Sequence, residues 1–79
     1  MAGGVHDERY RALIRQLKDA RIALGLSQEV VALNLGKRQQ FVSKYESGER
    51  RLDVIEFIDV ARQLRFDWQQ SLGVIIRGE

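Results

Sequence analysis

Apolar residues recur at helical spacing along the first third of the chain. Between Asp7 and Leu24 they gather on one face of a helical projection, and this pattern predicts an amphipathic helix. Gly25 follows directly and provides a stop signal. The apolar positions of this stretch are Tyr10, Leu13, Ile14, Leu17, Ala20, Ile22 and Leu24.

Capping and turn residues predict two shorter helices in the middle of the chain. Ser27 fits the N-cap of a helix with the sequence QEVVALNL, which ends at Gly36. After the turn GKR, a third helix is expected over about residues 39–47. Gly48 then suits the left-handed conformation with which many helices end.

The last third of the chain repeats one helix-start pattern. Asp53 and Glu56 stand three residues apart, as in a capping box, and are expected to open a fourth helix. Asp67 and Gln70 repeat this spacing and open a fifth, which contains Trp68. The β-branched sequence GVII near the end fits either a helix or a strand.

Together these elements predict an all-α fold, a compact five-helix bundle with a helix-turn-helix unit at about residues 28–47. At 79 residues with 44% hydrophobic content, the chain fits one small domain. We expect this single domain to span residues 7–79, preceded by a flexible N-terminal tail of residues 1–6.

Composition argues against several classes of function. The chain has no Cys, and His6 is its single histidine, so neither a metal site nor a cofactor is expected. No apolar run approaches the roughly 18 residues of a membrane span, and no signal peptide is recognisable. We therefore expect a soluble, cytoplasmic protein. An enzyme is the least supported class, because the sequence has no nucleophile–base pair and no phosphate-cradling glycine loop.

Positive charge concentrates in one segment, GKRQQFVSKYESGERR, residues 36–51. The formal net charge of the whole chain is only +2. This segment has five cations and two anions, whereas the residues after it have an acidic surplus. A local basic surplus of this kind is typical of a surface that meets nucleic acid.

The same segment has the geometry of a recognition helix. A three-residue turn with a glycine between two helices is typical of a helix-turn-helix, whose second helix enters the major groove. Val42 and Tyr45 are expected to point inward, which leaves the remaining positions to the outer face. Glutamine can pair with adenine, and lysine or arginine with guanine. An ordinary polar helix face is the alternative. The outer positions are Gln39, Gln40, Ser43 and Lys44.

The segment from Arg21 to Leu72 resembles the Cro/CI-type helix-turn-helix family, which includes lambdoid phage repressors and XRE-type regulators. The matching stretches are RIALGLSQ, then Ala32, Leu35 and Gly36, then QQFVSKYESG and FDWQQSLG. The resemblance implies a five-helix fold and a sequence-specific DNA-binding role in a prokaryote or phage, associated with the nucleoid. Such proteins usually bind a pseudo-palindromic operator as dimers.

The resemblance also implies roles for individual residues. An ion pair between Arg21 and Glu46 would tie the first helix to the third. The residues implied to contact bases are Arg38, Gln39, Gln40, Ser43 and Lys44. Those assigned to phosphates are Gln28, Lys37, Ser47, Arg50 and Arg51.

Several residues depart from the family pattern. Val30, Leu33 and Ile55 are apolar where members often have polar residues. Phe41 stands at a position where a small residue is common, and it either packs inward or touches a thymine methyl group. Arg65 replaces a frequent glycine after the fourth helix, so the way in which that helix ends is open.

Two functional hypotheses follow. The first is a small homodimeric transcriptional regulator: a Cro-like repressor, a restriction–modification controller or an antitoxin, among which the sequence does not distinguish. The second is a protein-interaction module, or a partner of a toxin, that uses the apolar departures as a binding patch. A homodimer would need a self-complementary patch, for which a tail folded over its own domain is the alternative. The residues predicted to form the dimer interface are Ile55, Leu72, Val74, Ile75 and Ile76.

Overall fold

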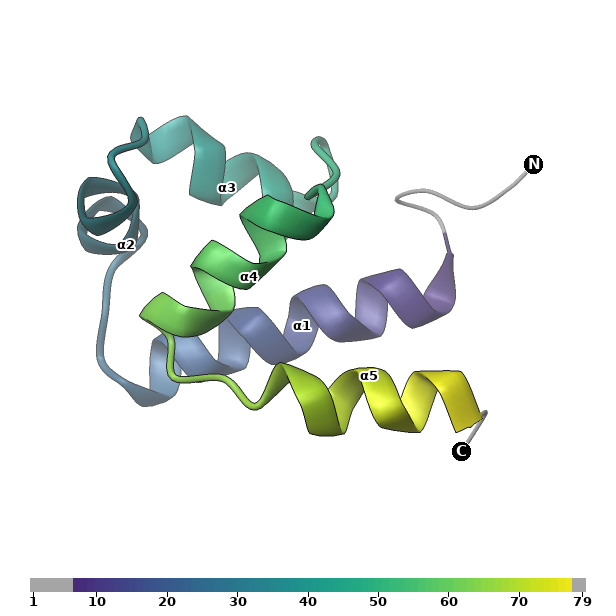
Figure 1. The fold of residues 1–79 in the computed structure, drawn as a ribbon. Coiled ribbons are helices and arrows are strands. Elements are labelled where there is room, and N and C mark those ends of the chain that lie inside the picture. The colour runs from purple at the N-terminus through teal and green to yellow at the C-terminus, as the bar shows by residue number, and fades with distance from the viewer. Residues whose placement is uncertain (1–6, 78–79) are drawn as a thin grey trace.

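Five helices joined by short turns make up the part of the chain that the structure, a computed structural model, describes, residues 7–77 (Figure 1). The prediction of an all-α fold with five helices is confirmed. The β-branched GVII sequence is helical. His6 and the predicted tail of residues 1–6 lie outside the described residues. The helices are α1 (Glu8–Ala23), α2 (Gln28–Leu35), α3 (Gln39–Ser47), α4 (Val54–Gln63) and α5 (Trp68–Arg77).

Side chains cap the helices at the positions that the sequence indicates. Ser27 Oγ accepts a hydrogen bond from the Val30 amide at 3.1 Å, at the start of α2. At the start of α4, Asp53 and Glu56 form a complete capping box, with hydrogen bonds of 2.7 and 3.0 Å. Each bond satisfies a first-turn amide that has no partner within its helix.

The hydrophobic core lies between α1, α2, α3 and α4. Helix α2 packs against α3 and α4, while α1 packs against α3. Helix α5 runs beside α1 (Figure 1). Its residues Trp68, Leu72 and Ile75 are partly buried against this core, and no residue of α5 is fully buried. The largest fully buried side chains are Tyr45, Leu17, Val31, Val42 and Val60.

The turn between α2 and α3 requires a glycine. Gly36 has φ of +70°, a left-handed conformation that costs a residue with a Cβ atom extra free energy. In this conformation the Lys37 amide reaches back to the Ala32 carbonyl at 2.9 Å and closes the end of α2. The turn is therefore short enough to hold α2 and α3 as one packed unit.

Candidate nucleic-acid interface

Helix α3 buries one face and exposes the other. Val42 and Tyr45 have no exposed area, so the predicted inward face is confirmed. On the opposite side Gln39, Gln40 and Lys44 are exposed to solvent. Their polar groups are therefore available to a ligand that approaches this face of the helix.

The predicted base-contacting residues lie together at the N-terminal half of α3 and on its outer face. Arg38 is the N-cap residue, and its side chain makes no capping hydrogen bond. Ser43 differs from the others, because it is half-buried and its Oγ donates to the Gln40 carbonyl at 3.3 Å. Four long polar side chains thus extend outward, and one short hydroxyl is already bonded to the helix itself.

A nearly buried ion pair holds the other end of α3. Arg21 Nε lies 2.7 Å from Glu46 Oε2, and Arg21 Nη2 lies 3.1 Å from Glu46 Oε1. These side chains are only 11% and 4% exposed. Arg21 also donates to the Leu26 carbonyl at 2.8 Å, and its bonds to Glu46 raise the pKa of its guanidinium. The pair therefore joins α1, the α1–α2 loop and α3 in one arrangement.

Gln28 belongs to the same network. The family resemblance assigns it to a phosphate, and in the structure its Nε2 donates to Glu46 Oε1 at 2.9 Å. The start of α2 is thereby bonded to α3. Because an amide nitrogen has two donors, one remains for an external acceptor.

Arg50, which the family resemblance assigns to a phosphate, has a partner within the protein. Arg50 Nη2 lies 2.7 Å from Glu56 Oε2, and Arg50 Nη1 lies 2.9 Å from Glu56 Oε1. Its guanidinium carbon also lies 4.9 Å from the centre of the Phe41 ring. This bidentate pair, together with the Asp53 amide, lowers the pKa of Glu56 to about 2.

Phe41 packs inward rather than extending from the surface. Its ring meets the Tyr45 ring edge-on, with 5.5 Å between centroids, and packs against the core. Lys37 Nζ lies 5.3 Å from the centre of the same ring. The aromatic side chain thus holds two cations, Lys37 and Arg50, beside the start of α3.

The remaining predicted phosphate contacts lie at the end of α3 and in the loop after it. Ser47 Oγ is 3.1 Å from both the Lys44 carbonyl and Glu49 Oε2, so its hydroxyl already has partners. Arg51 is exposed, and its guanidinium carbon lies 5.7 Å from the centre of the Tyr10 ring.

Tyr10 has a role that sequence reasoning missed. Its hydroxyl accepts a hydrogen bond from the Leu52 amide at 2.9 Å, which fixes the α3–α4 loop to α1. The partners are 42 residues apart, and the sequence identified Tyr10 only as an apolar position of the first helix. No local signal distinguishes this tyrosine from a plain core residue.

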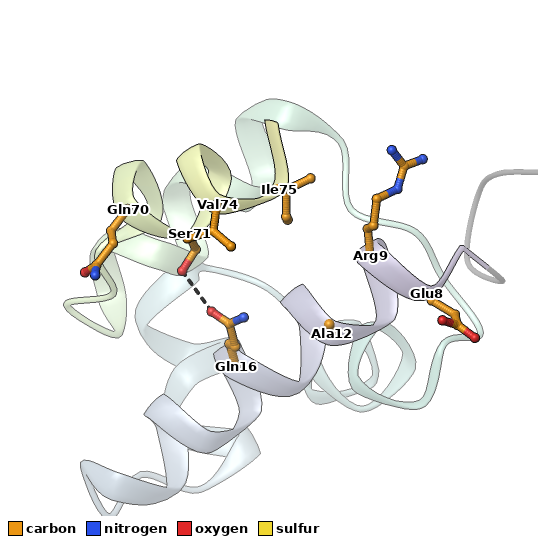
Figure 2. Close-up of a pocket in the computed structure, with 8 residues that line it drawn as sticks. All are labelled: Glu8, Arg9, Ala12, Gln16, Gln70, Ser71, Val74 and Ile75. Carbon is orange, nitrogen blue, oxygen red and sulfur yellow. Dashed lines mark hydrogen bonds between the residues drawn. The ribbon is translucent and has the colours of Figure 1, made fainter. Parts of the chain in front are cut away.

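The predicted dimer residues fall into two groups. Leu72 and Ile75 pack against the core, so part of their apolar area is already covered within the chain. Ile55 and Ile76 are 66% and 83% exposed, on α4 and α5. Val74 lines a groove of about 720 Å³ between α1 and α5, which is bridged by a 2.8 Å hydrogen bond from Ser71 to Gln16 (Figure 2).

Comparison with known proteins identifies the family of this arrangement. A helix-turn-helix family model matches residues 17–70, which include all of α2, α3 and α4. The chain belongs to this helix-turn-helix family. A solved structure described as an XRE-family like protein from Pseudomonas syringae pv. tomato str. DC3000 is 48% identical, with a TM-score of 0.80. The match covers 87% of this chain and 84% of that one. No curated protein matches the sequence.

The XRE-type helix-turn-helix is a fold of DNA-binding regulators and is not typically enzymatic. Within residues 7–77, no cluster of His, Asp and Glu side chains is suited to hold a metal ion. None of the helices in this range is both long and apolar enough to span a bilayer.

Proposed function

We propose that this chain is a sequence-specific regulator of transcription, which acts as a repressor when a homodimer occupies a pseudo-palindromic operator. The observation that carries the proposal is the division of α3 into a buried apolar face and an exposed polar one. Val42 and Tyr45 hold the helix on the core, while Gln39, Gln40 and Lys44 face outward. In the major groove, this outer face would lie against base edges.

The chemistry of the exposed side chains suits direct readout of bases. The terminal amide of Gln39 or Gln40 can donate a hydrogen bond to N7 of adenine and accept one from its N6 amino group. The cations of Arg38 and Lys44 can donate hydrogen bonds to O6 and N7 of guanine. Each good bidentate contact contributes about 1–3 kcal/mol of discrimination against the wrong base. Ser43, half-buried and bonded to Gln40, is assigned a smaller part.

Phosphate contacts would set the position of α3 in the groove. Lys37 and Arg51 are exposed cations just before and after α3, and the second donor of the Gln28 amide would add a neutral contact at the start of α2. The network of Arg21, Glu46 and Gln28 supports this geometry, because it orients α3 relative to α1 and α2 before any DNA binds.

Selection from a random duplex library tests the proposal. Wild-type protein should enrich an inverted repeat, with half-sites centred about 34 Å apart or a multiple of that spacing. The Gln39→Ala and Gln40→Ala variants should each lose preference at one position of the half-site while binding random DNA as before. Enrichment of no sequence, with tight binding to all duplexes, would contradict the proposed sequence-specific role.

A protein-interaction module is the second candidate, because exposed apolar residues favour it. Leu33 is 76% exposed and Ile55 is 66% exposed, while the neighbouring Val30 is 40% exposed. A regulator would lose DNA affinity steeply as salt is raised, since phosphate contacts release counterions. A chain that binds no duplex at low salt would instead favour a protein partner, such as a toxin.

A further inference from the structure

A second cationic surface lies on α1, outside the set of residues assigned to DNA above. Arg11, Arg15 and Lys18 stand four and three residues apart, so they form one stripe along the helix. All three are exposed. Within residues 7–77 none of them forms an ion pair or a side-chain hydrogen bond, unlike Arg9, Arg21 and Arg50, each of which has a carboxylate partner.

The stripe adjoins the end of the recognition helix. Arg11 and Arg15 line a hollow of about 390 Å³, whose other wall includes Glu46, Ser47 and Gly48 at the C-terminus of α3. Tyr10 and Ile14 complete the lining from α1. Ser47, which the family resemblance assigns to a phosphate, thus lines the hollow, and Arg51, a proposed phosphate contact, lies over the ring of Tyr10 at its edge.

The carboxylates around this hollow leave its cations uncompensated. Glu46 lines it, but Arg21 neutralises the charge of that carboxylate and Gln28 donates a hydrogen bond to it. The Glu46 side chain is also only 4% exposed. Glu8 lies beside Arg11 and Arg15 on the outer side of α1, and Glu49 is bonded to Ser47. Neither acid pairs with the stripe within the described part of the chain.

We infer that this groove, the α1–α3 groove, binds backbone phosphates of DNA that flank the recognised half-site. Arg11 and Arg15 are separated by about 6 Å along the helix axis at 1.5 Å per residue. Successive phosphates of one strand are about 3.4 Å apart along the DNA axis, so the two guanidinium groups can reach different phosphates. The inference rests on the proposed function, and it extends the footprint of each subunit beyond the bases that α3 reads.

Two duplexes that differ only in length test the groove. The short one ends at the edges of the site obtained by selection, and the long one has about one more helical turn, roughly 10 base pairs, on each side. The double variant Arg11→Gln/Arg15→Gln should bind the short duplex like wild type. On the long duplex at about 100 mM salt it should bind on the order of 10-fold more weakly, and its salt slope should fall by about two units per subunit.

Matched variants separate a local contact from the loss of bulk charge. Arg62→Gln/Arg65→Gln removes two exposed cations at the end of α4 and should leave binding to both duplexes unchanged. Arg11→Lys/Arg15→Lys keeps the charge and should keep the salt slope. Circular dichroism checks that each variant is folded, as expected for substitutions at exposed positions.

Each other outcome contradicts a distinct claim. If the Arg11/Arg15 variant loses affinity equally on both duplexes, or loses no more than the Arg62/Arg65 control on the long one, the groove does not bind flanking phosphates. If wild-type protein binds neither duplex, the proposed function itself fails, and the groove proposal fails with it. Wild-type binding combined with a loss confined to the long duplex supports both.

Discussion

The guanidinium of Arg50 connects three parts of the domain: the α3–α4 loop, the first turn of α4 and the Phe41 ring. Its partner Glu56 has a second role, because Oε1 accepts from both Arg50 Nη1 and the Asp53 amide. One carboxylate thus closes the capping box and holds the loop. With these donors around it, Glu56 stays ionised well below the usual range for a glutamate, and its pKa is about 2.

The lowered pKa of Glu56 predicts how stability depends on pH. Because the pKa of the folded state lies below the unfolded value, the ionised side chain stabilises the protein above about pH 4.5, and this contribution is lost as the pH falls toward 2. Glu56→Gln retains an acceptor for the capping box but removes the charge. It should lower the free energy of unfolding by about 1 kcal/mol at pH 7, since Arg50 is partly exposed.

Urea unfolding of wild type and Glu56→Gln at pH 7, 4 and 2.5 measures this difference. The difference between the two proteins should shrink steadily from pH 7 to pH 2.5, because Glu56 is already protonated in the unfolded state at pH 2.5 and begins to be protonated in the folded state near its pKa of about 2. A gap that stays constant over this range would show that the charge of Glu56 does not stabilise the fold.

Adjacent arginines are predicted to have different roles. Arg51 is exposed and lies over the Tyr10 ring, whereas Arg50 is bonded to Glu56. Arg51→Gln should therefore weaken binding to all duplexes and reduce the salt slope by about one unit, the value for one phosphate contact. Arg50→Gln should change the slope less and lower the urea midpoint instead. Equal reductions of the slope would mean that Arg50 leaves Glu56 to bind DNA.

At the scale of the helices, the network of Arg21, Glu46 and Gln28 fixes the orientation of α3 relative to α1 and α2. Arg21→Gln should be strongly destabilising, by about 3–5 kcal/mol, because it leaves the Glu46 carboxylate nearly buried without its cation. The double variant Arg21→Gln/Glu46→Gln removes both charges and should recover part of that loss. Chemical unfolding of both single variants and the double variant gives the coupling energy, and additive losses would show that the two side chains act independently.

The end of α4 contains the one non-glycine residue of the described chain with a positive φ. Arg65 has φ of +54°, and the Phe66 amide reaches back to the Ala61 carbonyl at 2.9 Å, as when a glycine ends a helix. The question that the sequence left open is thereby answered: the helix ends in the usual way despite the arginine.

Arg65→Gly should raise the stability of the fold. Glycine adopts this conformation without the steric cost that a Cβ atom brings, about 1 kcal/mol, although its greater freedom in the unfolded chain offsets part of the gain. A thermal melt should show a midpoint raised by a few degrees. Arg62→Gly, in the last turn of α4 where the backbone is still helical, is the matched control and should lower the midpoint. A lower midpoint for Arg65→Gly as well would indicate that its side chain contributes more than its backbone costs.

The helices themselves were predictable from the sequence because their start and stop signals are local. Ser27 and Asp53 bond amides three residues ahead, and such spacing can be read directly along the chain. The inward face of α3 was predictable for the same reason, from the spacing of Val42 and Tyr45.

The partners of the site residues depend on how distant segments pack, and most of them were not predictable from local spacing. Gln28 meets Glu46 across 18 residues, and Tyr10 meets Leu52 across 42. The Arg21–Glu46 contact was expected only from the family resemblance. Arg50 is the clearest example of a partner that local spacing did not reveal. It stands in a basic run that suggests a solvent-exposed cation, but its guanidinium is bonded to Glu56, six residues further along the chain. The assignments of individual residues to bases and phosphates remain predictions.

On the scale of the whole molecule, the outer face of α3 and the groove between α1 and α5 are formed by different residues. The cations of α3, of the loop after it and of the α1–α3 groove adjoin one another around the end of α3. The groove between α1 and α5 is lined by Ala12, Val74 and Ile75 together with polar or charged residues, Glu8, Arg9, Gln16, Gln70 and Ser71 (Figure 2). A second subunit that docked there would leave the outer face of α3 open to DNA, because none of the α3 residues lines this groove.

The last prediction concerns that second subunit. One helix-turn-helix of this size offers a small contact area, and two copies on an inverted repeat would bind far more tightly. Ile76 is 83% exposed on α5, the helix that also contributes Val74 and Ile75 to the groove, so a twofold contact through α5 would cover apolar area that a monomer leaves in water. Wild type should sediment at twice the monomer mass at high micromolar concentration, and Ile76→Asp should sediment as a folded monomer. Leu33→Asp, at a residue 76% exposed on α2, is the control and should remain dimeric. A monomeric wild type, or an Ile76→Asp variant that dimerises as wild type does, would contradict a dimer built on α5.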